Sequence, residues 1–479
     1  MKKASHKLIS ALLTAVIVVG LLPILGLPVS AIDVNTYTDL QSAAATGTGD
    51  IRLTGNITGA TQLLIARTLT LDLNGHELKI ELNAATGAAA NGIKIATGVK
   101  LTITDGSSPS TGKLTVINKT ISGTTDGNGA AINTSDGTLV IQSGTVEATG
   151  GYYGAGIGGG RYGDDGGTIT ISGGTVKAKG GDDSAGIGGG NQGAGGTITI
   201  NGGEVTATGG GYGAGIGGGG SNTGIGGASG DILIYGENTV VKATRGTDTT
   251  NDIGAGTGSG GTGATDNIFV ALPFGNLTLT NNTPAPNTVT FSAKPASAGT
   301  VTAEFPAGTF AGIDILAGLT APKTFSVIAQ GGITDVGFKL SGYPDVPKTA
   351  AQLAAAGATV EFVILSAPTA PQNLAAVAGN GQVALSWAAP ASDGNSAITG
   401  YQVSSDGGAT WTAASGHTAH TFTGLSNGTT YTFAVRAVNA AGPGASATTT
   451  ATPAGVPGTQ TYTITFDANG GSVTPGTWS

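Results

Sequence analysis

The chain contains no cysteine, one methionine and few charged or aromatic side chains among its 479 residues. The absence of cysteine excludes a disulfide framework and any metal site built from thiolates. Charged residues make up only 10% of the chain and mean hydropathy is slightly positive, which together exclude a highly charged disordered protein. Hydrogen bonds between strands and the packing of apolar side chains must therefore hold the fold together.

Basic residues are scarce, yet three lysines lie within the first seven positions. An apolar run follows from Leu8 to Leu27, and the small residues "VSA" at positions 29–31 suit a signal peptidase. This pattern predicts a secretory signal peptide over residues 1–31, with cleavage before Ile32. The alternative is an uncleaved membrane anchor, because the run is long enough to span a bilayer, although two prolines near its end favour cleavage.

The net charge is −8, and loss of the three N-terminal lysines on cleavage would take it to −11. An acidic secreted protein is poorly suited to nucleic acid or to anionic lipid, because both carry negative charge. We therefore expect no nucleic-acid partner and no membrane insertion after the signal is removed.

Glycine is abundant, with 87 residues, and much of it lies in a repeat. Three units start at Gly137, Gly167 and Gly196, at spacings of 30 and 29 residues, and each contains "GAGIGGG" or "SAGIGGG". A weaker fourth unit, "GDILIYGENTVVKAT", starts at Gly230. Repeats of this length are typical of stacked architectures in which each copy buries a face against its neighbours.

Apolar and polar residues alternate within each unit with a period of two, which is typical of β-strands. Three short strands per unit, separated by glycine corners and stacked about 4.8 Å apart, predict a right-handed parallel β-helix. We expect Ile169, Ile198 and Ile232 to form one inward column. Gly156, Gly186 and Gly215 are expected to be equivalent outward strand positions that tolerate serine.

These units and the alternating segments before them resemble the β-helical repeat regions of large secreted surface proteins of bacteria. The resemblance covers residues 33–270 and implies the right-handed parallel β-helix that pectate lyases also have. It implies no particular activity, because enzymes, adhesins and inert stalks all use this fold.

The composition changes after residue 270. Residues 271–365 predict a small β-rich domain that caps the β-helix or links it to the next module, and residues 366–371 predict a linker. Residues 372–453 resemble a fibronectin type III domain, a family in which a tryptophan fills the core and a tyrosine corner pins two strands. The matching fold-defining residues are Trp387, Tyr401, Leu425 and Tyr431.

Residues 461–479 include "YTITFDANGGSVTPGTW", which resembles the start of the Listeria–Bacteroides repeat of bacterial cell-surface proteins. Only the opening strand and turn are present, so we expect an incomplete module, and the resemblance implies a location at the cell envelope. The fold class expected for the whole chain is all-β, a right-handed parallel β-helix followed by β-sandwich modules in an elongated multidomain protein.

Two acidic pairs, Asp164–Asp165 and Asp182–Asp183, are the first candidates for catalysis or for a Ca²⁺ contact. They occupy different corners of the coil, and adjacent aspartates in glycine loops are usually turns or solvated charges. His417 and His420 are expected on opposite faces of a strand, which does not suit one shared metal. The sequence thus assigns no catalytic, cofactor-binding or metal-ligating residue, and Ca²⁺ is the one candidate cofactor.

The aromatic residues of the regular units are tyrosines, which can stack on sugar rings or simply shield the corners. The candidate glycan contacts are Tyr152, Tyr153, Tyr162 and Tyr212. We therefore expect a secreted, cell-envelope structural or adhesive protein whose partner is a polysaccharide or another surface protein. The alternative is a β-helix carbohydrate-active enzyme, either a polysaccharide lyase or a glycoside hydrolase.

Overall fold

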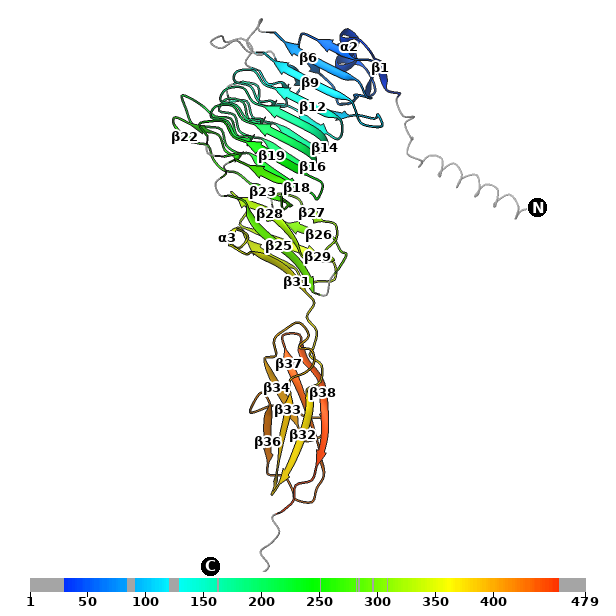
Figure 1. Ribbon diagram of the computed structural model, residues 1–479, viewed down its shortest axis with the longest axis vertical. Helices are drawn as coiled ribbons and strands as arrows, with labels where there is room; N and C mark the ends of the chain where they lie inside the picture. The colour runs from blue at the N-terminus through cyan, green and yellow to red at the C-terminus, as the bar shows by residue number, and fades with distance from the viewer. Residues whose placement is uncertain are drawn as a thin grey trace, which may run out of the picture. The chain divides into compact units, whose positions relative to one another are not determined.

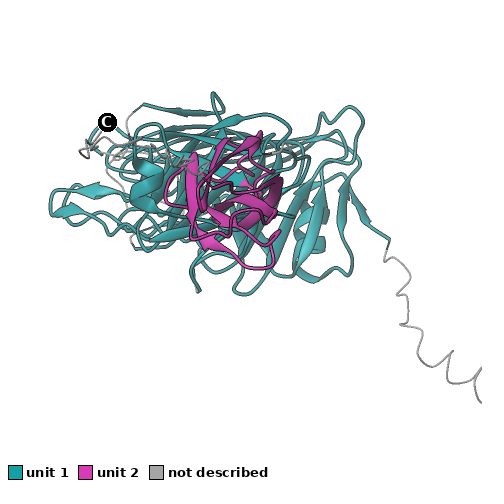
Figure 2. Ribbon diagram, turned by 90° about the horizontal axis from the view of Figure 1, so that it is seen from below, with its two compact units in different colours: residues 1–362 teal, residues 363–479 magenta. Residues whose placement is uncertain are grey.

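The structure is a computed structural model. It describes residues 30–83, 91–119, 129–161, 163–249, 251–280, 282, 285–294, 297–307 and 309–455. The expected signal peptide, apart from its last two residues, and the expected Listeria–Bacteroides segment lie outside these ranges. The chain divides into two compact units, residues 1–362 and 363–479, which Figure 2 shows in different colours.

The first unit begins with stacked coils whose walls are two ladders of parallel strands and one separate parallel sheet (Figure 1). The first ladder joins β1 (Ile32–Val34), β2 (Ile51–Leu53), β5 (Leu69–Asp72), β8 (Lys100–Thr104), β11 (Thr138–Ile141), β14 (Thr168–Lys179), β16 (Thr197–Thr208), β18 (Asp231–Tyr235) and β23 (Ile268–Pro273). The second ladder joins β3 (Ile57–Gly59), β6 (Glu77–Leu82), β9 (Lys113–Asn118), β12 (Thr145–Thr149), β14, β16, β19 (Val240–Thr244) and β24 (Leu277–Leu279). The third wall is a seven-stranded sheet of β4 (Leu63–Ile65), β7 (Ile93–Ile95), β10 (Ile132–Asn133), β13 (Ile157–Gly158), β15 (Ile187–Gly188), β17 (Ile216–Gly217) and β20 (Ile253–Gly254).

This arrangement confirms the predicted parallel β-helix with three strand segments per coil. In two coils the first two segments run on as one strand of 12 residues, β14 and β16, which bends at a pair of glycines. Gly174 and Gly203 have φ of +79° and +80° at these bends, a conformation that glycine adopts without strain.

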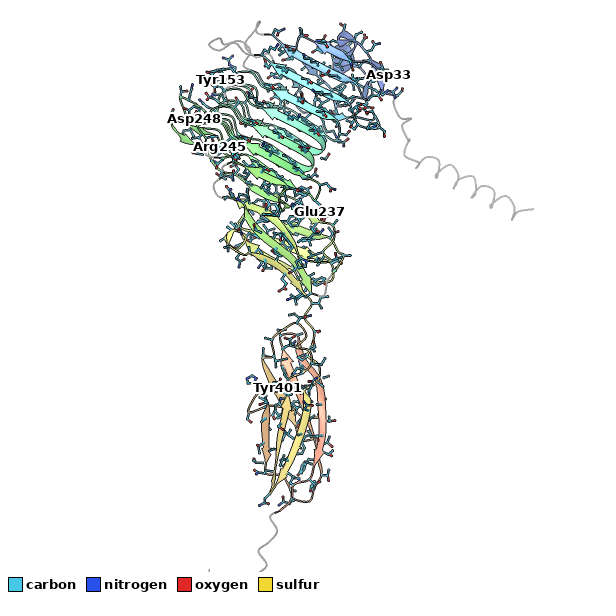
Figure 3. All side chains as sticks on the ribbon, viewed as in Figure 1. Asp33, Tyr153, Glu237, Arg245, Asp248 and Tyr401 are labelled. Atoms are coloured by element: carbon cyan, nitrogen blue, oxygen red, sulfur yellow. The ribbon has the colours of Figure 1, made fainter. Side chains whose placement is uncertain are left out.

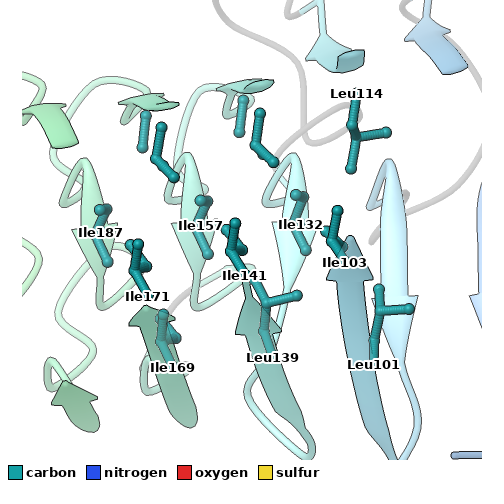
Figure 4. Packing of buried hydrophobic residues seen from close by; sticks show 14 of the residues in the cluster. Leu101, Ile103, Leu114, Ile132, Leu139, Ile141, Ile157, Ile169, Ile171 and Ile187 are labelled. Atoms are coloured by element: carbon teal, nitrogen blue, oxygen red, sulfur yellow. The ribbon is translucent and has the colours of Figure 1, made fainter. Parts of the chain in front are cut away.

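The core of the β-helix is a set of columns of aliphatic side chains, one residue from each coil (Figure 4). Ile169 pairs with Ile198 and Ile198 with Ile232, and all three side chains are fully buried. The predicted inward column is therefore confirmed, and it follows directly from the alternation, because every second residue of a strand faces the same side.

At one corner of the coils a carboxylate is buried, where the strands bury aliphatic side chains. Asp105 follows β8, and burial alone would raise the pKa of this carboxyl. Hydrogen bonds from the Ser110 hydroxyl and from the backbone N–H groups of Gly112 and Gly75, at 2.7, 2.6 and 2.8 Å, outweigh burial and lower the pKa to about 2. The ionised carboxylate thus ties together the corners of neighbouring coils.

The N-terminal coil is covered by helix α2 (Tyr37–Thr46), whose Leu40, Ala43 and Ala44 join the β-helix core. Thr36 caps the helix by accepting the N–H of Asp39 at 3.1 Å. Within the described part of the chain, neither this helix nor α3 (Ala350–Ala354) is long and apolar enough to cross a membrane.

At the other end, β23 belongs to two structures at once. Ile268, Val270 and Leu272 complete the β-helix core, whereas Phe269 and Ala271 face a second core. The strand pairs in parallel with β18 on one side and antiparallel with β28 (Lys323–Gln330) on the other. The boundary expected between residues 270 and 271 therefore falls inside a strand that both parts share.

The module after β23 is a small sandwich around five buried phenylalanines, at positions 269, 291, 325, 338 and 362. One layer continues from β23 through β28, β25 (Asn287–Lys294) and β31 (Thr359–Val363). The other layer contains β26 (Val301–Glu304), β27 (Ile313–Leu316), β29 (Asp335–Leu340) and β30 (Val346–Thr349). The short helix α3 packs its Leu353 into this core. The short antiparallel pair β21 (Thr257–Gly258) and β22 (Gly261–Thr262) lies apart from these layers.

The second unit is a seven-stranded sandwich. Its sheets are β32 (Gln372–Gly379), β33 (Gln382–Ala388) and β36 (Ala419–Thr423), and β35 (Thr412–Ala413), β34 (Gly400–Ser404), β37 (Tyr431–Asn439) and β38 (Gly442–Ala451). Trp387 and Tyr401 lie in its core with ring centroids 5.5 Å apart, and Leu425 packs against this core. The Tyr431 hydroxyl accepts the backbone N–H of Ser426 at 3.1 Å, which is the geometry of a tyrosine corner.

Candidate functional site

A groove crosses four successive coils of the β-helix at the corner between the second ladder and the third sheet. Its volume is about 610 Å³. The residues that line it are Ile117, Asn118, Lys119, Thr149, Gly150, Gly151, Tyr152, Lys179, Gly180, Gly181, Asp182 and Gly210. The floor is therefore largely glycine, and the exposed or half-buried side chains that line it are an aromatic ring, an aliphatic chain, a hydroxyl and three charges. Asn118 is buried, and its amide donates to the carbonyl oxygen of Gly129 at 2.8 Å.

The two lysines that line the groove differ in whether they form an ion pair. Lys119 forms an ion pair with Glu81, which Lys79 also contacts at 2.8 Å, and the hydrogen bonds of the two ammonium groups lower the pKa of the Glu81 carboxyl to about 2. Lys179 is exposed and forms no ion pair with any residue that the structure describes. Lys119, Lys179 and Asp182 are all exposed, so these are the charges that a ligand would meet in the groove.

The four candidate tyrosines have different surroundings. Tyr152 lines the groove, and its ring meets the ring of Tyr153 edge to face with centroids 4.5 Å apart. Tyr153, in the same coil, and Tyr212, in another coil, are half-buried but do not line the groove. Tyr162 lies outside the described residues. Of the three candidate tyrosines that the structure describes, Tyr152 lines this groove and the other two do not.

The expectation for Gly156, Gly186 and Gly215 is wrong. All three residues are buried, and a Cβ atom at Gly186 would lie 2.6 Å from the backbone nitrogen of Thr208 and 2.7 Å from the carbonyl oxygen of Gly215. The backbone of the next coil occupies the space that the period-two pattern assigned to solvent. Glycine is required there because the coils approach each other closely, and no ligand can reach this face.

The acidic pair Asp182–Asp183 is divided between solvent and interior. Both residues lie in a turn, one of the two expectations for such a pair; Asp182 is exposed, whereas Asp183 has a φ of +59° and is only 1% exposed, so it is not a solvated charge. The Asp183 carboxylate accepts the side-chain amide of Asn191 at 3.3 Å and a backbone N–H from Asn222. Burial, together with the charges of Asp182 and Asp248, raises the pKa of Asp183 to about 6.

One sequence signal pointed to this burial. Asp183 occupies the repeat position of Tyr153 and Tyr212. The backbone carbonyl oxygens of Tyr153, Asp183 and Tyr212 accept the backbone N–H groups of Asn191, Gly220 and Thr257, respectively, at 3.0, 2.7 and 3.1 Å. The position is thus a covered corner in each coil. Figure 3 shows Tyr153 and Asp248 along the same edge of the stacked coils.

No group of three or more histidine, aspartate or glutamate side chains among the described residues is placed to share a metal ion. Asp164 and Asp165 instead accept backbone N–H groups, from Arg161 at 3.2 Å and from Ala194 at 2.8 Å. His417 lies against Tyr401 and His420 against Phe422, with ring centroids 6.3 and 4.6 Å apart.

Two family models match parts of the chain. The Beta helix repeat matches residues 139–161, 169–191 and 198–220, which carry groove residues of three coils, and also Asp183 and Asn191. The fibronectin type III domain matches residues 369–452.

Solved structures with a matching segment include the twitchin kinase region from C. elegans, 28% identical over 19% of this chain and 17% of that chain, with a TM-score of 0.17. Titin kinase with its flanking domains is 31% identical over 17% of this chain and 16% of that chain, with a TM-score of 0.15. A human fibronectin type III domain is 24% identical over 20% of this chain and 94% of its own length, with a TM-score of 0.16. The chain spans about one sixth of the length of the first two relatives.

Proposed function

We propose that this protein is a secreted cell-surface protein that binds polysaccharide along the groove of its β-helix. The observation that carries the proposal is the lining of the groove, where Tyr152, Lys179 and Asp182 surround a glycine floor. A sugar ring has an apolar face that stacks on an aromatic side chain and a polar rim that hydrogen bonds to amides and charges. A groove that crosses several coils suits a linear polymer better than a small molecule.

The domain content supports the same proposal. Beta helix repeats and a fibronectin type III domain fit a surface or adhesive protein. Secretion rests on the N-terminal pattern of lysines, apolar run and small residues. N-terminal sequencing of the exported protein should find Ile32, or a residue next to it, at the start. Finding Met1 would refute the cleavage.

Binding is tested with purified bacterial cell-wall polysaccharides on a glycan array, followed by calorimetry of any that bind. Tyr152→Ala removes the stacking surface, and we expect affinity to fall about fivefold or more. Lys179→Ala should weaken the binding of acidic polysaccharides and leave the binding of neutral ones unchanged.

Each variant has a matched control. Lys177→Ala removes a lysine that lies two positions before Lys179 and pairs with Glu147 at 3.3 Å, outside the groove. Tyr212→Ala removes a tyrosine from an equivalent corner outside the groove. Equal binding by all four variants and the unaltered protein would contradict the proposed site. An assay for release of reducing ends from the same polysaccharides distinguishes adhesion from the enzymatic alternative.

A further inference from the structure

A second concave surface lies where the last coils of the β-helix meet the small sandwich. It is a pocket of about 520 Å³, and the residues that line it are Glu237, Asn238, Pro273, Phe274, Lys323, Thr324 and Phe325. They come from the turn between β18 and β19, from the end of β23 with the turn after it, and from β28. Figure 3 labels Glu237 beside this junction. The pocket lies within the first unit and shares no residue with the groove that Tyr152 lines.

One lining residue is an aromatic ring that the core does not bury. Phe274 is 70% exposed, whereas the other phenylalanines of the described chain are buried or half-buried. Burial of a phenylalanine side chain stabilises a fold by about 1.5–3 kcal/mol, so a ring left in water forgoes that stabilisation. An exposed phenylalanine at a concave surface is therefore a contact for a ligand that has an apolar face.

The turn that carries Phe274 is held by hydrogen bonds on both sides. The Phe274 N–H donates to the carbonyl oxygen of Thr324 at 3.1 Å. The Asn276 N–H closes the turn by donating to the carbonyl oxygen of Pro273 at 2.9 Å, and the Asn276 side chain donates to the carbonyl oxygen of Thr239 at 3.1 Å. The ring thus stands on a fixed backbone, so a ligand that stacks on it has little of the chain to order.

The polar side of the pocket is an ion pair with unused hydrogen-bonding capacity. Oε1 of Glu237 accepts Nζ of Lys323 at 2.7 Å, and Oε2 accepts the backbone N–H of Ala317 at 3.3 Å. A carboxylate has about four lone-pair sites and an ammonium group has three N–H donors, so each group can bind further partners. The exposed side chains of Asn238 and Thr324 add an amide and a hydroxyl to the same lining.

The two charges of the pocket cancel, which distinguishes it from the groove with its two lysines and one aspartate. An anionic ligand is repelled by Glu237 and a cationic ligand by Lys323, so neither gains from the ion pair as a whole. A hydroxyl group both donates and accepts, and can therefore bind either member of the pair. A neutral sugar ring has such hydroxyl groups around its rim and an apolar face that fits an aromatic side chain.

We propose that this pocket is a second sugar-binding site, separate from the groove and selective for neutral saccharides. Phe274 stacks on the apolar face of one sugar ring, Glu237 accepts a hydroxyl group, and Lys323 donates to a neighbouring one. The volume of the pocket is within the range of about 300–1,000 Å³ of small-molecule sites, so it takes a short stretch of a saccharide and not a long polymer. This site does not depend on the function proposed for the groove.

A glycan array of neutral oligosaccharides, with oligogalacturonate as the acidic comparison, tests the pocket, and calorimetry measures the affinities. Phe274→Ala should lower the affinity for a neutral oligosaccharide about fivefold or more, whereas Phe274→Trp keeps a stacking surface and should retain binding. Glu237→Gln keeps the shape of the side chain but leaves the charge of Lys323 uncompensated. It should therefore weaken neutral binding and strengthen the binding of oligogalacturonate.

Each variant has a matched control in the first unit. Ile225→Ala removes another exposed apolar side chain, 60% exposed and outside the pocket. Glu304→Gln changes a carboxylate that lies 3.9 Å from Lys339, also outside the pocket. Both controls should bind as the unaltered protein does. The urea transition of Phe274→Ala, followed by circular dichroism, should match that of Ile225→Ala, because both side chains are already in water.

Tyr152→Ala separates this site from the groove. Neutral oligosaccharides that still bind to Tyr152→Ala but bind more weakly to Phe274→Ala support the pocket. If the groove variants alter the binding of no polysaccharide and Phe274→Ala still weakens neutral binding, the function proposed for the groove fails and the pocket stands. The proposal is overturned if no neutral oligosaccharide binds, or if Phe274→Ala binds as tightly as Ile225→Ala.

Discussion

Replacing Gly186 by alanine should destabilise the β-helix although the residue lies in a strand-like segment with an ordinary φ. The new Cβ atom would lie 2.6 Å from the backbone nitrogen of Thr208, and ordinary contact begins near 3.4 Å, so the neighbouring coil must move by about 0.8 Å. The moving backbone takes part in hydrogen bonds of 3.1 Å from Gly186 to Ala214 and 3.0 Å from Ile187 to Gly215.

A displacement of this size lengthens both hydrogen bonds beyond their normal range of 2.7–3.2 Å. Overpacking costs about 1–3 kcal/mol, and a weakened buried hydrogen bond adds about 1 kcal/mol. We therefore expect Gly186→Ala to lower the free energy of unfolding by about 2–4 kcal/mol. Two control variants separate the effects. Gly55→Ala has only one contact, at 3.7 Å, and should be neutral, whereas Gly98→Ala has open space but a φ of +72° and should cost about 1 kcal/mol.

The two units can be followed separately during urea denaturation. All three tryptophans of the sequence follow residue 363, so tryptophan fluorescence reports on the second unit, and far-ultraviolet circular dichroism reports mainly on the larger first unit. Gly186→Ala should shift the dichroism transition and leave the fluorescence transition in place. If Gly186→Ala unfolds at the same urea concentration as Gly55→Ala, the close approach of the coils is not what requires glycine here.

Three further predictions use the same denaturation assays. Ile198→Asp buries an unpaired charge and should cost several kcal/mol, whereas Thr199→Asp should cost under about 1 kcal/mol, and equal losses would contradict the inward and outward assignment. The ionised Asp105 carboxylate, whose pKa is depressed, contributes stability that is present above pH 4 and lost as the pH falls toward 2. Asp105→Asn should therefore lower the free energy of unfolding by about 2 kcal/mol at pH 7 and weaken its dependence on pH in acid. An unchanged dependence on pH would refute the role of that carboxylate. Tyr431→Phe should cost the second unit about 1 kcal/mol, seen by tryptophan fluorescence, because the backbone N–H of Ser426 loses its acceptor; an unchanged transition would show that water replaces the hydroxyl.

The inward columns were predictable because strand periodicity depends only on the alternation of side chains. Ile169 and Ile198 are buried in register for this reason. The same rule failed at Gly186, because a two-residue strand followed by a sharp corner brings the next coil over the outward face. Alternation describes one strand, and it contains no information on what the rest of the chain places against it.

The candidate site was predictable only in its aromatic component. Tyr152 stood out because aromatic side chains are rare in the repeats, but the groove beside it requires knowledge of how Asn118 and Lys179 align across coils. The turn at Asp183 was predictable, because adjacent aspartates in a glycine-rich loop usually form a turn or a solvated charge, but the burial of Asp183 was not. Burial of one member comes from the segment 220–222 of another coil, about forty residues later in the sequence.

The double role of β23 has a consequence for how the stack of coils ends. A parallel stack exposes a row of backbone N–H and C=O groups at its last strand, and such an edge recruits any strand that can pair with it, including the first coil of a second molecule. Antiparallel pairing with β28 occupies this edge, and Phe269 anchors the covering layer in its own core. The module after the β-helix thereby prevents the addition of a foreign strand to the edge of β23, and α2 covers the first coil.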